Sequence, residues 1–340
     1  MTDSLMRREI AEIPQAVARL LDRGSGPVRA AAAAMRATDP AVIVTVARGS
    51  SDHACTYLKY AAELLLGLPV ASVGPSVASI YGARLRVKGA VCLSVSQSGQ
   101  SPDIVEMTRA AGEGGALTVA LTNNAASRLA DVAEAVIDIH AGPELSVAAT
   151  KTFVTSAVAG LWLIAEVKGD AALIAAIHDL PEKLDRARGM DWSAVSAALG
   201  VGSIYTLGRG PSWAMSNEAA LKFKEVCQIH AESYSSAEVL HGPVSIVDRG
   251  FPVLAFAAAD AAESPLAQVA DALAEKGAEV FATTSLVRRA SALPLVRTGH
   301  PLTDPLALIV SFYSMIETVA RDRGLDPDMP RHLKKVTETT

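Results

Sequence analysis

Three ionisable residues in the second half of the chain have the spacing of one helix face. Glu218, Lys222 and Glu225 lie four and three residues apart, and side chains at those intervals meet on a helix surface. A carboxylate can move a proton between adjacent carbon atoms when it lies within hydrogen-bond reach of both. A neighbouring ammonium group can tune that carboxylate or assist proton transfer at hydroxyl groups. The same spacing also fits a solvated stripe of ion pairs, so both interpretations stay open.

A second cluster, rich in hydroxyl groups, occupies residues 96–102 with the sequence SQSGQSP. It continues an apolar run, and its proline suits the first position of the helix predicted after it. A helix N-terminus at the end of a parallel strand offers backbone N–H groups and a favourable dipole to an anion. Ser96, Ser98 and Ser101 add hydroxyl donors, and Gly99 allows the backbone to approach closely. The pattern favours phosphate binding, with an ordinary serine-rich turn as the alternative.

Both clusters depend on the elements that carry them. Short apolar runs alternate with longer helical patterns, such as residues 52–66 and 102–112, along the whole chain. This alternation is typical of parallel sheets with helices on both faces. The predicted strands are residues 41–47, 90–96, 117–122 and 135–139 in the first half, and 203–207, 252–257, 279–283 and 293–297 in the second.

The two halves are similar to each other at a constant offset. Residues 48–51 (RGSS) match residues 209–212 (RGPS), and Gly89 matches Gly250, in both cases 161 positions later. Such self-similarity indicates duplication of a whole domain. In the second copy, residues 257–261 (AAADA) stand where the serine-rich loop should be, without hydroxyl groups and with a carboxylate. We therefore predict one phosphate site per chain, in the first half.

We expect an α/β fold of two tandem domains, each a doubly wound, flavodoxin-like parallel sheet flanked by helices. The predicted parts are an N-terminal helical segment (1–30), a phosphate-binding first domain (31–170), a second domain with the helix of Glu225 (190–326) and a C-terminal tail (327–340).

Composition narrows the class of function. Half of the 340 residues are hydrophobic and the net charge is −5, which argues against nucleic-acid binding without excluding small anionic substrates. The sequence has no nucleotide-binding glycine motif and no metal-ligand spacing, so we expect neither a metal nor another cofactor. Three scattered cysteines, no apolar leader and no stretch long enough to cross a bilayer predict a cytoplasmic protein without membrane contact.

Longer motifs carry a resemblance to a known family. The serine-rich loop, residues 140–153 (HAGPELSVAATKTF), 218–243 (EAALKFKEVCQIHAESYSSAEVLHGP) and 330–335 (PRHLKK) resemble the sugar isomerase (SIS) domain. Together they are similar to the isomerase half of the glutamine–fructose-6-phosphate aminotransferases, also called glucosamine-6-phosphate synthases. The resemblance spans about residues 30–340.

One departure bears on the reaction. The synthases carry an N-terminal glutaminase domain whose catalytic cysteine follows the initiator methionine, whereas Thr2 follows Met1 here. The expectation is therefore an enzyme similar to the isomerase-like glucosamine-6-phosphate deaminases, which convert glucosamine 6-phosphate and water to fructose 6-phosphate and ammonia. The alternatives are a deaminase or deglycase for galactosamine 6-phosphate or a fructosamine 6-phosphate adduct, ammonia-dependent synthesis of glucosamine 6-phosphate, and a non-catalytic sugar-phosphate sensor.

The resemblance also implies roles for residues that bind the substrate. Val147 would line the sugar through its backbone, and Arg48 is a further candidate, although a structural salt bridge fits it equally. The phosphate would be held by Ser96, Gln97, Ser98 and Ser101, and Ser51 would either join them or bind the sugar.

The same resemblance assigns the chemistry. Glu225 would be the general base, assisted by Lys222, and His241 would open the sugar ring, since histidine can titrate near neutrality. In the family this histidine comes from the neighbouring subunit, which implies a homodimer; a capping histidine in a turn is the alternative. Lys335, in a tail that would close the site, matches the Schiff-base lysine. A solvated tail lysine, or a shift of the match to Lys334, stays possible.

Overall fold

The computed structural model describes residues 3–200 and 202–335, which form two compact units. Among the described residues, the first-sheet unit consists of Gln15–Glu144, Lys151–His178 and residues 334–335. The second-sheet unit consists of residues 3–14, Leu145–Thr150, residues 179–200 and residues 202–333. Each unit contains one five-stranded sheet, in which every strand pair is parallel.

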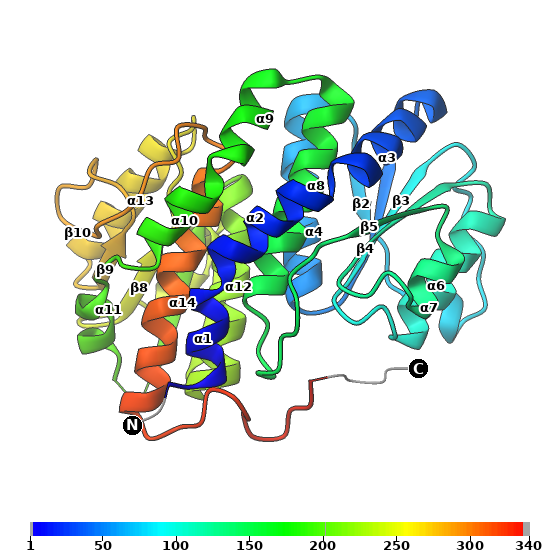
Figure 1. Cartoon of the computed structure of the whole chain (residues 1–340). Coiled ribbons are helices and arrows are strands. Elements are labelled where there is room, and N and C mark those ends of the chain that lie inside the picture. Colours follow the sequence, from blue (N-terminus) through cyan, green and yellow to red (C-terminus); the bar gives the residue numbers. More distant parts are fainter. Residues whose placement is uncertain (1–2, 201, 336–340) are drawn as a thin grey trace. The chain divides into compact units, whose positions relative to one another are not determined.

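The first sheet has the strand order β2-β1-β3-β4-β5. Helices α3, α4 and α8 cover one face, and α6 and α7 lie on the other (Figure 1). The strands are β1 (Ile43–Val46), β2 (Val70–Ser72), β3 (Val91–Ser96), β4 (Leu117–Thr122) and β5 (Ala135–Asp138). The helices are α2 (Ile13–Arg23), α3 (Ser25–Thr38), α4 (Ser50–Leu66), α5 (Ser76–Ser79), α6 (Pro102–Glu113), α7 (Arg128–Val132), α8 (Lys151–Lys168) and α9 (Ala171–His178).

The second sheet repeats this order as β7-β6-β8-β9-β10. Its strands are β6 (Ser203–Gly208), β7 (His230–Ser235), β8 (Pro252–Ala255), β9 (Glu279–Ala282) and β10 (Ser291–Ala292). The helices are α1 (Leu5–Ala11), α10 (Leu180–Ala187), α11 (Ser193–Ala198), α12 (Pro211–Cys227), α13 (Glu263–Glu275) and α14 (Asp304–Asp322), with short 3₁₀ turns η1 (Glu238–His241) and η2 (Pro243–Ile246).

Backbone geometry confirms the duplication. Gly49 caps α4 with φ 56° and ψ −133°, and Gly210 caps α12 with φ 57° and ψ −136°. A positive φ of this kind is open to glycine and strained for other residues. The RG motif therefore marks the same turn in both copies, where the chain leaves the first strand and enters its helix.

The strand predictions hold with one exception. Residues 293–297 were expected to form a strand, but the chain is irregular there after the two-residue strand β10. Pro294 lies in the middle of this run and has no N–H for a strand ladder; its carbonyl accepts a hydrogen bond from the Trp192 indole instead. The edge strands β2 and β7 were not predicted, because one is three residues long and the other is largely polar.

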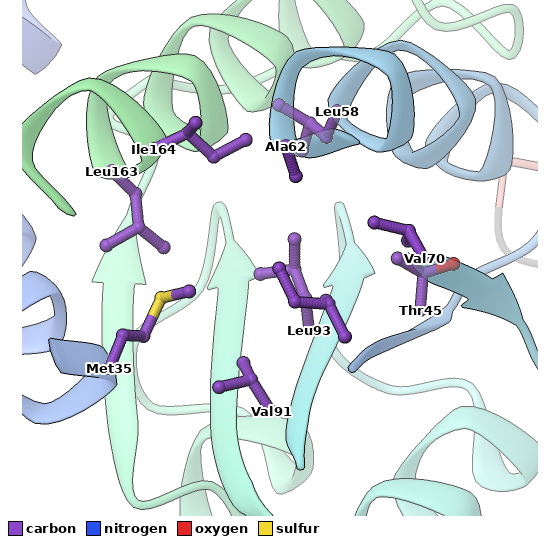
Figure 2. A pocket seen from close by; sticks show the side chains of 10 residues that line it. Met35, Thr45, Leu58, Ala62, Val70, Val91, Leu93, Leu163 and Ile164 are labelled. Carbon is purple, nitrogen blue, oxygen red and sulfur yellow. The ribbon is translucent and has the colours of Figure 1, made fainter. Parts of the chain in front are cut away.

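Equivalent core layers of the two units are filled differently. Between the first sheet and helices α3, α4 and α8, aliphatic side chains and Met35 enclose a cavity of about 10 Å³ (Figure 2). In the second-sheet unit, Phe223 on α12 and Phe312 on α14 pack edge to face with centroids 5.4 Å apart. Phe223 occupies the position that corresponds to Ala62 at the offset of 161 residues.

Helix α8 is a long apolar helix of the first-sheet unit, and its residues from Lys151 to Ala165 are buried. It is therefore a core helix. Within the residues that the structure describes, no helix has the length and apolarity to cross a membrane.

Candidate active site

The serine-rich loop connects β3 to α6, and two of its hydroxyl groups accept hydrogen bonds from backbone N–H groups of the same loop. The Ser96 hydroxyl accepts a hydrogen bond from Gly99 N at 3.2 Å, and the Ser98 hydroxyl accepts one from Gln100 N at 3.2 Å. Ser101 is the N-cap of α6, and its side chain makes no capping hydrogen bond. The structure thus brings Ser96, Gln97, Ser98 and Ser101 together at a helix N-terminus, an arrangement suited to an anion.

Gly99 fixes the shape of this loop. Its φ is +62°, and a Cβ atom there would lie 2.1 Å from the Ser127 hydroxyl oxygen and 2.5 Å from the Ser127 Cβ. Its carbonyl also accepts a hydrogen bond from Leu129 N at 3.0 Å. Because both the dihedral angle and the space exclude a side chain, the loop conformation requires glycine at this position.

Arg48 and Ser51 follow β1 at the same edge of the first sheet. Nε and Nη2 of Arg48 donate to one carboxylate oxygen of Asp103, at 3.0 and 2.9 Å, and the Asp103 side chain is fully buried. Of the two interpretations of Arg48, the structure supports the salt bridge, which ties the end of β1 to the first turn of α6. Ser51 lies partly exposed in the first turn of α4.

The ionisable array of the second-sheet unit lies on α12. Lys222 Nζ is 2.9 Å from Glu218 Oε1 and 2.6 Å from Glu225 Oε2. The Lys222 and Glu218 side chains are fully buried, whereas Glu225 is 21% exposed. Tyr313 donates a hydrogen bond to Glu218. The interpretation as a solvated stripe is therefore wrong: two members are buried, and Glu225 alone reaches the surface.

In this array a single ammonium group, that of Lys222, contacts two carboxylates. Burial alone would lower the pKa of Lys222, but the carboxylates of Glu218 and Glu225 outweigh it and raise that pKa above its usual range. Lys222 is therefore a permanent cation at neutral pH. Its ammonium group holds the Glu225 carboxylate in one orientation through a hydrogen bond.

Lys335 has a specific partner within the first-sheet unit. Its ammonium group lies 2.8 Å from Oε2 of Glu144, a fully buried carboxylate that also accepts hydrogen bonds from the backbone and hydroxyl of Thr152. Burial would raise the pKa of Glu144, but the Lys335 cation outweighs it and lowers that pKa. Lys335 is thus an ion-paired residue rather than a solvated one, while Lys334 is exposed.

The remaining two predicted residues belong to the second-sheet unit. Val147 is partly buried, and its N–H donates to the carbonyl of Asp328 at 3.0 Å. The N–H of Val147 is therefore already used, and the carbonyl is the backbone group that can accept a hydrogen bond from a sugar hydroxyl. His241 is exposed at the end of η1, followed by Gly242 with φ 145°.

Some residues around these groups were not identified from the sequence. Glu144 binds the tail lysine, and Glu9 and Asp328 hold the loop of Val147 through hydrogen bonds. No local pattern marks them, since their partners lie far away in the chain. Among the residues that the structure describes, no group of three or more histidine, cysteine, aspartate or glutamate side chains could hold a metal ion.

Two doubly wound parallel sheets of identical strand order define a tandem α/β protein, and its first sheet carries a serine-rich loop at a helix N-terminus, a position suited to an anion. The sequence profile of the SIS domain matches residues 38–165 and 200–292. The chain belongs to the SIS domain family.

Comparison with individual proteins agrees with this assignment. The chain is 68% identical to a protein from Silicibacter pomeroyi DSS-3, provisionally described as a phosphosugar isomerase, with a TM-score of 0.93 over 96% of this chain and 100% of that one. It is 25% identical to the C-terminal domain of glucosamine-fructose-6-phosphate aminotransferase from Francisella tularensis, with a TM-score of 0.83 over 97% and 98% of the two chains.

Full-length relatives extend beyond this chain. The glutamine–fructose-6-phosphate aminotransferase (isomerizing) of Methanothermobacter thermautotrophicus is 32% identical over 346 residues, which cover 98% of this chain and 57% of that protein. The chain spans about half the length of the curated relatives that it matches.

Proposed function

We propose that the protein is an aldose–ketose isomerase and deaminase that converts glucosamine 6-phosphate and water to fructose 6-phosphate and ammonia. The observation that carries this proposal is the array on α12. The buried Glu218 and the buried Lys222 support Glu225, which is the partly exposed one of the two carboxylates. Isomerisation of a sugar phosphate requires a fixed carboxylate of this kind, together with an element that binds the phosphate.

In the proposed reaction the loop of residues 96–101 and Ser51 bind the phosphate. Once the ring is open, Glu225 takes the proton from C2 and returns a proton to C1, while the amine nitrogen loses a proton and O1 gains one. The C2 amine thereby becomes an imine, and the C1 aldehyde becomes an alcohol. Water then adds at C2 and ammonia leaves, so the ketone of fructose 6-phosphate remains. Lys222 keeps the Glu225 carboxylate oriented throughout, through the hydrogen bond described above.

Two further residues have proposed roles at the beginning and end of this sequence. His241 would transfer the proton that opens the ring, supplied by the second subunit of a homodimer. Its exposure supports this, as does its place between two exposed apolar residues, Leu240 and Ile246. A covalent role would have the Lys335 amine attack C2, and in the structure its nitrogen lies 2.8 Å from Glu144. Borohydride trapping with substrate distinguishes a covalent role of Lys335 from a role in closing the site.

The decisive experiment measures ammonia and fructose 6-phosphate formed from glucosamine 6-phosphate. We expect both products from the wild type and a decrease in kcat of about 10²–10⁴-fold for Glu225→Gln. Glu275→Gln, on the exposed surface of α13, is the matched control and should keep full activity. Absence of ammonia from a folded wild-type protein would contradict the deaminase.

The same samples then test the other substrates. Galactosamine 6-phosphate and a fructosamine 6-phosphate adduct replace glucosamine 6-phosphate, and fructose 6-phosphate with ammonium tests the reverse direction. If sugar phosphates bind but none is turned over, the protein is a sensor and the catalytic assignment of Glu225 is wrong.

A further inference from the structure

A buried carboxylate on the N-terminal helix contacts the loop of Val147. Glu9 on α1 is 4% exposed. Its carboxylate accepts hydrogen bonds from Ser146 N at 3.3 Å, from the Ser146 hydroxyl and from Leu145 N. The three donors belong to two consecutive residues, so one side chain determines the path of the backbone immediately before Val147.

The loop is held from a second direction by the segment that follows α14. The carbonyl of Asp328 accepts the N–H of Val147 at 3.0 Å. The carboxylate of the same residue accepts the N–H groups of Leu5 and Met6, each at 2.8 Å, at the N-terminus of α1. A carboxylate at this end of a helix is favoured by the helix dipole. Helix α1, the loop and the chain end are therefore joined by hydrogen bonds into one assembly.

Helix α1 itself is anchored on α14, and the two helices lie side by side (Figure 1). Arg7 forms an ion pair with Glu317, a fully buried residue of α14, and donates to the Thr318 hydroxyl at 2.7 Å. Ser4 donates to the same glutamate at 2.7 Å. Glu9 thus acts from a fixed helix, and a loop held in this way has few conformations to choose from.

We propose that Glu9 is a positioning residue for the sugar: it orients the carbonyl of Val147 by holding the two preceding residues. This inference rests on the proposed function, because Val147 is assigned to the sugar there. Hydrogen bonds to an ionised carboxylate are stronger than those between neutral groups. An amide in place of the Glu9 carboxylate would direct its NH₂ group toward some of the same donors, so the loop would shift. A small displacement of a substrate-contacting group reduces binding and rate far more than it changes stability.

The test compares Glu9→Gln and Glu9→Asp with Arg7→Met. We expect Glu9→Gln to raise the KM for glucosamine 6-phosphate roughly tenfold, while the affinity for inorganic phosphate stays unchanged because its loop is not touched. Glu9→Asp should recover part of the loss. Arg7→Met removes an anchor of α1 without removing the Glu9 contacts, so it should lower Tm with little change in KM.

A direct readout separates this proposal from the deaminase proposal. Amide hydrogen exchange should become faster at Leu145 and Ser146 in Glu9→Gln, and calorimetry should show weaker binding of glucosamine 6-phosphate even if the wild type releases no ammonia. Unchanged sugar-phosphate affinity despite faster exchange would overturn the positioning role. Parallel losses of Tm and kcat in Glu9→Gln and Arg7→Met, with KM unchanged, would also overturn it, because they indicate a structural role alone.

Discussion

The loop after the third strand of each sheet occurs twice in this chain, and its backbone amides serve different partners. In the first copy, residues 96–101 present hydroxyl and amide groups at the start of α6. In the second copy, Ala259 N donates to the carboxylate of Asp304 at 3.0 Å, and Arg297 contacts both that carboxylate and the carbonyl of Ala257. The same fold therefore offers an anion position twice, and the second copy supplies an anion of its own.

Each copy also pairs a buried carboxylate with a cation, from different places in the chain. Asp304 and Glu263 share Arg297, which comes from the irregular segment after β10. Glu144 instead pairs with Lys335, from the end of the chain. Both partners of the first pair belong to the second-sheet unit, and both partners of the second pair belong to the first-sheet unit. After duplication, the strand order of the sheet was preserved while the polar groups at its edge diverged.

The largest effect is expected when a carboxylate is introduced into the first loop, because the first loop then carries a negative charge as the second one does. We expect Ser98→Asp to weaken binding of glucosamine 6-phosphate by at least about 100-fold, because like charges at contact distance cost several kcal/mol. Ser98 is partly exposed, so the fold should persist. Isothermal titration calorimetry measures the effect.

The matched control restores a hydroxyl group in the second copy. Ala259 corresponds to Ser98 at the offset of 161 residues. Ala259→Ser should leave the affinity and the number of bound ligands unchanged, because Asp304 already accepts the local amide. A second phosphate bound to this variant would show that the two loops differ only in their hydroxyl groups.

The difference between the loops could be predicted in part from sequence. The absence of serine from residues 257–261 shows in the sequence itself that the second loop lacks hydroxyl donors, and phosphate binding by the first copy alone stays a prediction. The residue that accepts the hydrogen bond of the second loop could not be predicted from the sequence, because Asp304 lies 45 residues after Ala259. The parallel α/β architecture and its duplication followed from alternating patterns and the repeat, whereas the edge strands β2 and β7 did not. The prediction of a strand at residues 293–297 was wrong. Pro294 and Arg297 in this run contact Trp192, Glu263 and Asp304, which are distant in sequence.

Removing the internal anion of the second copy should reduce stability. Asp304 accepts hydrogen bonds from the backbone and hydroxyl of Thr298 in addition to Ala259, and is buried. In Asp304→Asn, the NH₂ group of the new amide faces some of these hydrogen-bond donors, and part of the Arg297 charge loses its counter-charge. We expect these two changes to lower the free energy of unfolding by about 2–4 kcal/mol. Urea unfolding measures this, with exposed Asp322→Asn as control. Equal midpoints for the two variants would contradict an internal role for this anion.

The candidate site was predictable to the extent that its residues are close in sequence. The spacing of Glu218, Lys222 and Glu225 indicated a shared helix face, but not which members are buried. Lys335 required the family resemblance, and its partner Glu144 is 191 residues away. Glu9 reaches Ser146 across 137 residues, so no local pattern could have revealed it.

The ion pair of the first copy should respond to pH. The pKa of Glu144 is lowered in the folded protein by Lys335 despite burial. A lowered folded pKa contributes stability above the usual glutamate pKa of about 4.3, and this contribution is lost as the pH falls through the folded value. The free energy of unfolding of the wild type should exceed that of Glu144→Gln by roughly 1–2 kcal/mol at neutral pH. This difference should disappear as the pH is lowered. Unfolding free energies of both proteins between about pH 7 and pH 3 test this. A gap that widens toward low pH would contradict the assigned sign.

The smallest expected effect is that of one added methylene in the core layer, which the two copies pack differently. Figure 2 shows Val91 and Leu93 of the first sheet facing Leu58 and Ala62 of α4 across the cavity. Val91→Ile adds one methylene to a strand position, and we expect a gain of up to about 0.8 kcal/mol in unfolding free energy. Ala62→Phe copies the aromatic residue of the second copy, but about 10 Å³ cannot hold a ring, so a loss of about 1–3 kcal/mol is expected. Thermal unfolding of both variants measures the two changes. A gain from Ala62→Phe would mean that the first core can adopt the aromatic packing of the second, and the two layers would then differ in sequence alone.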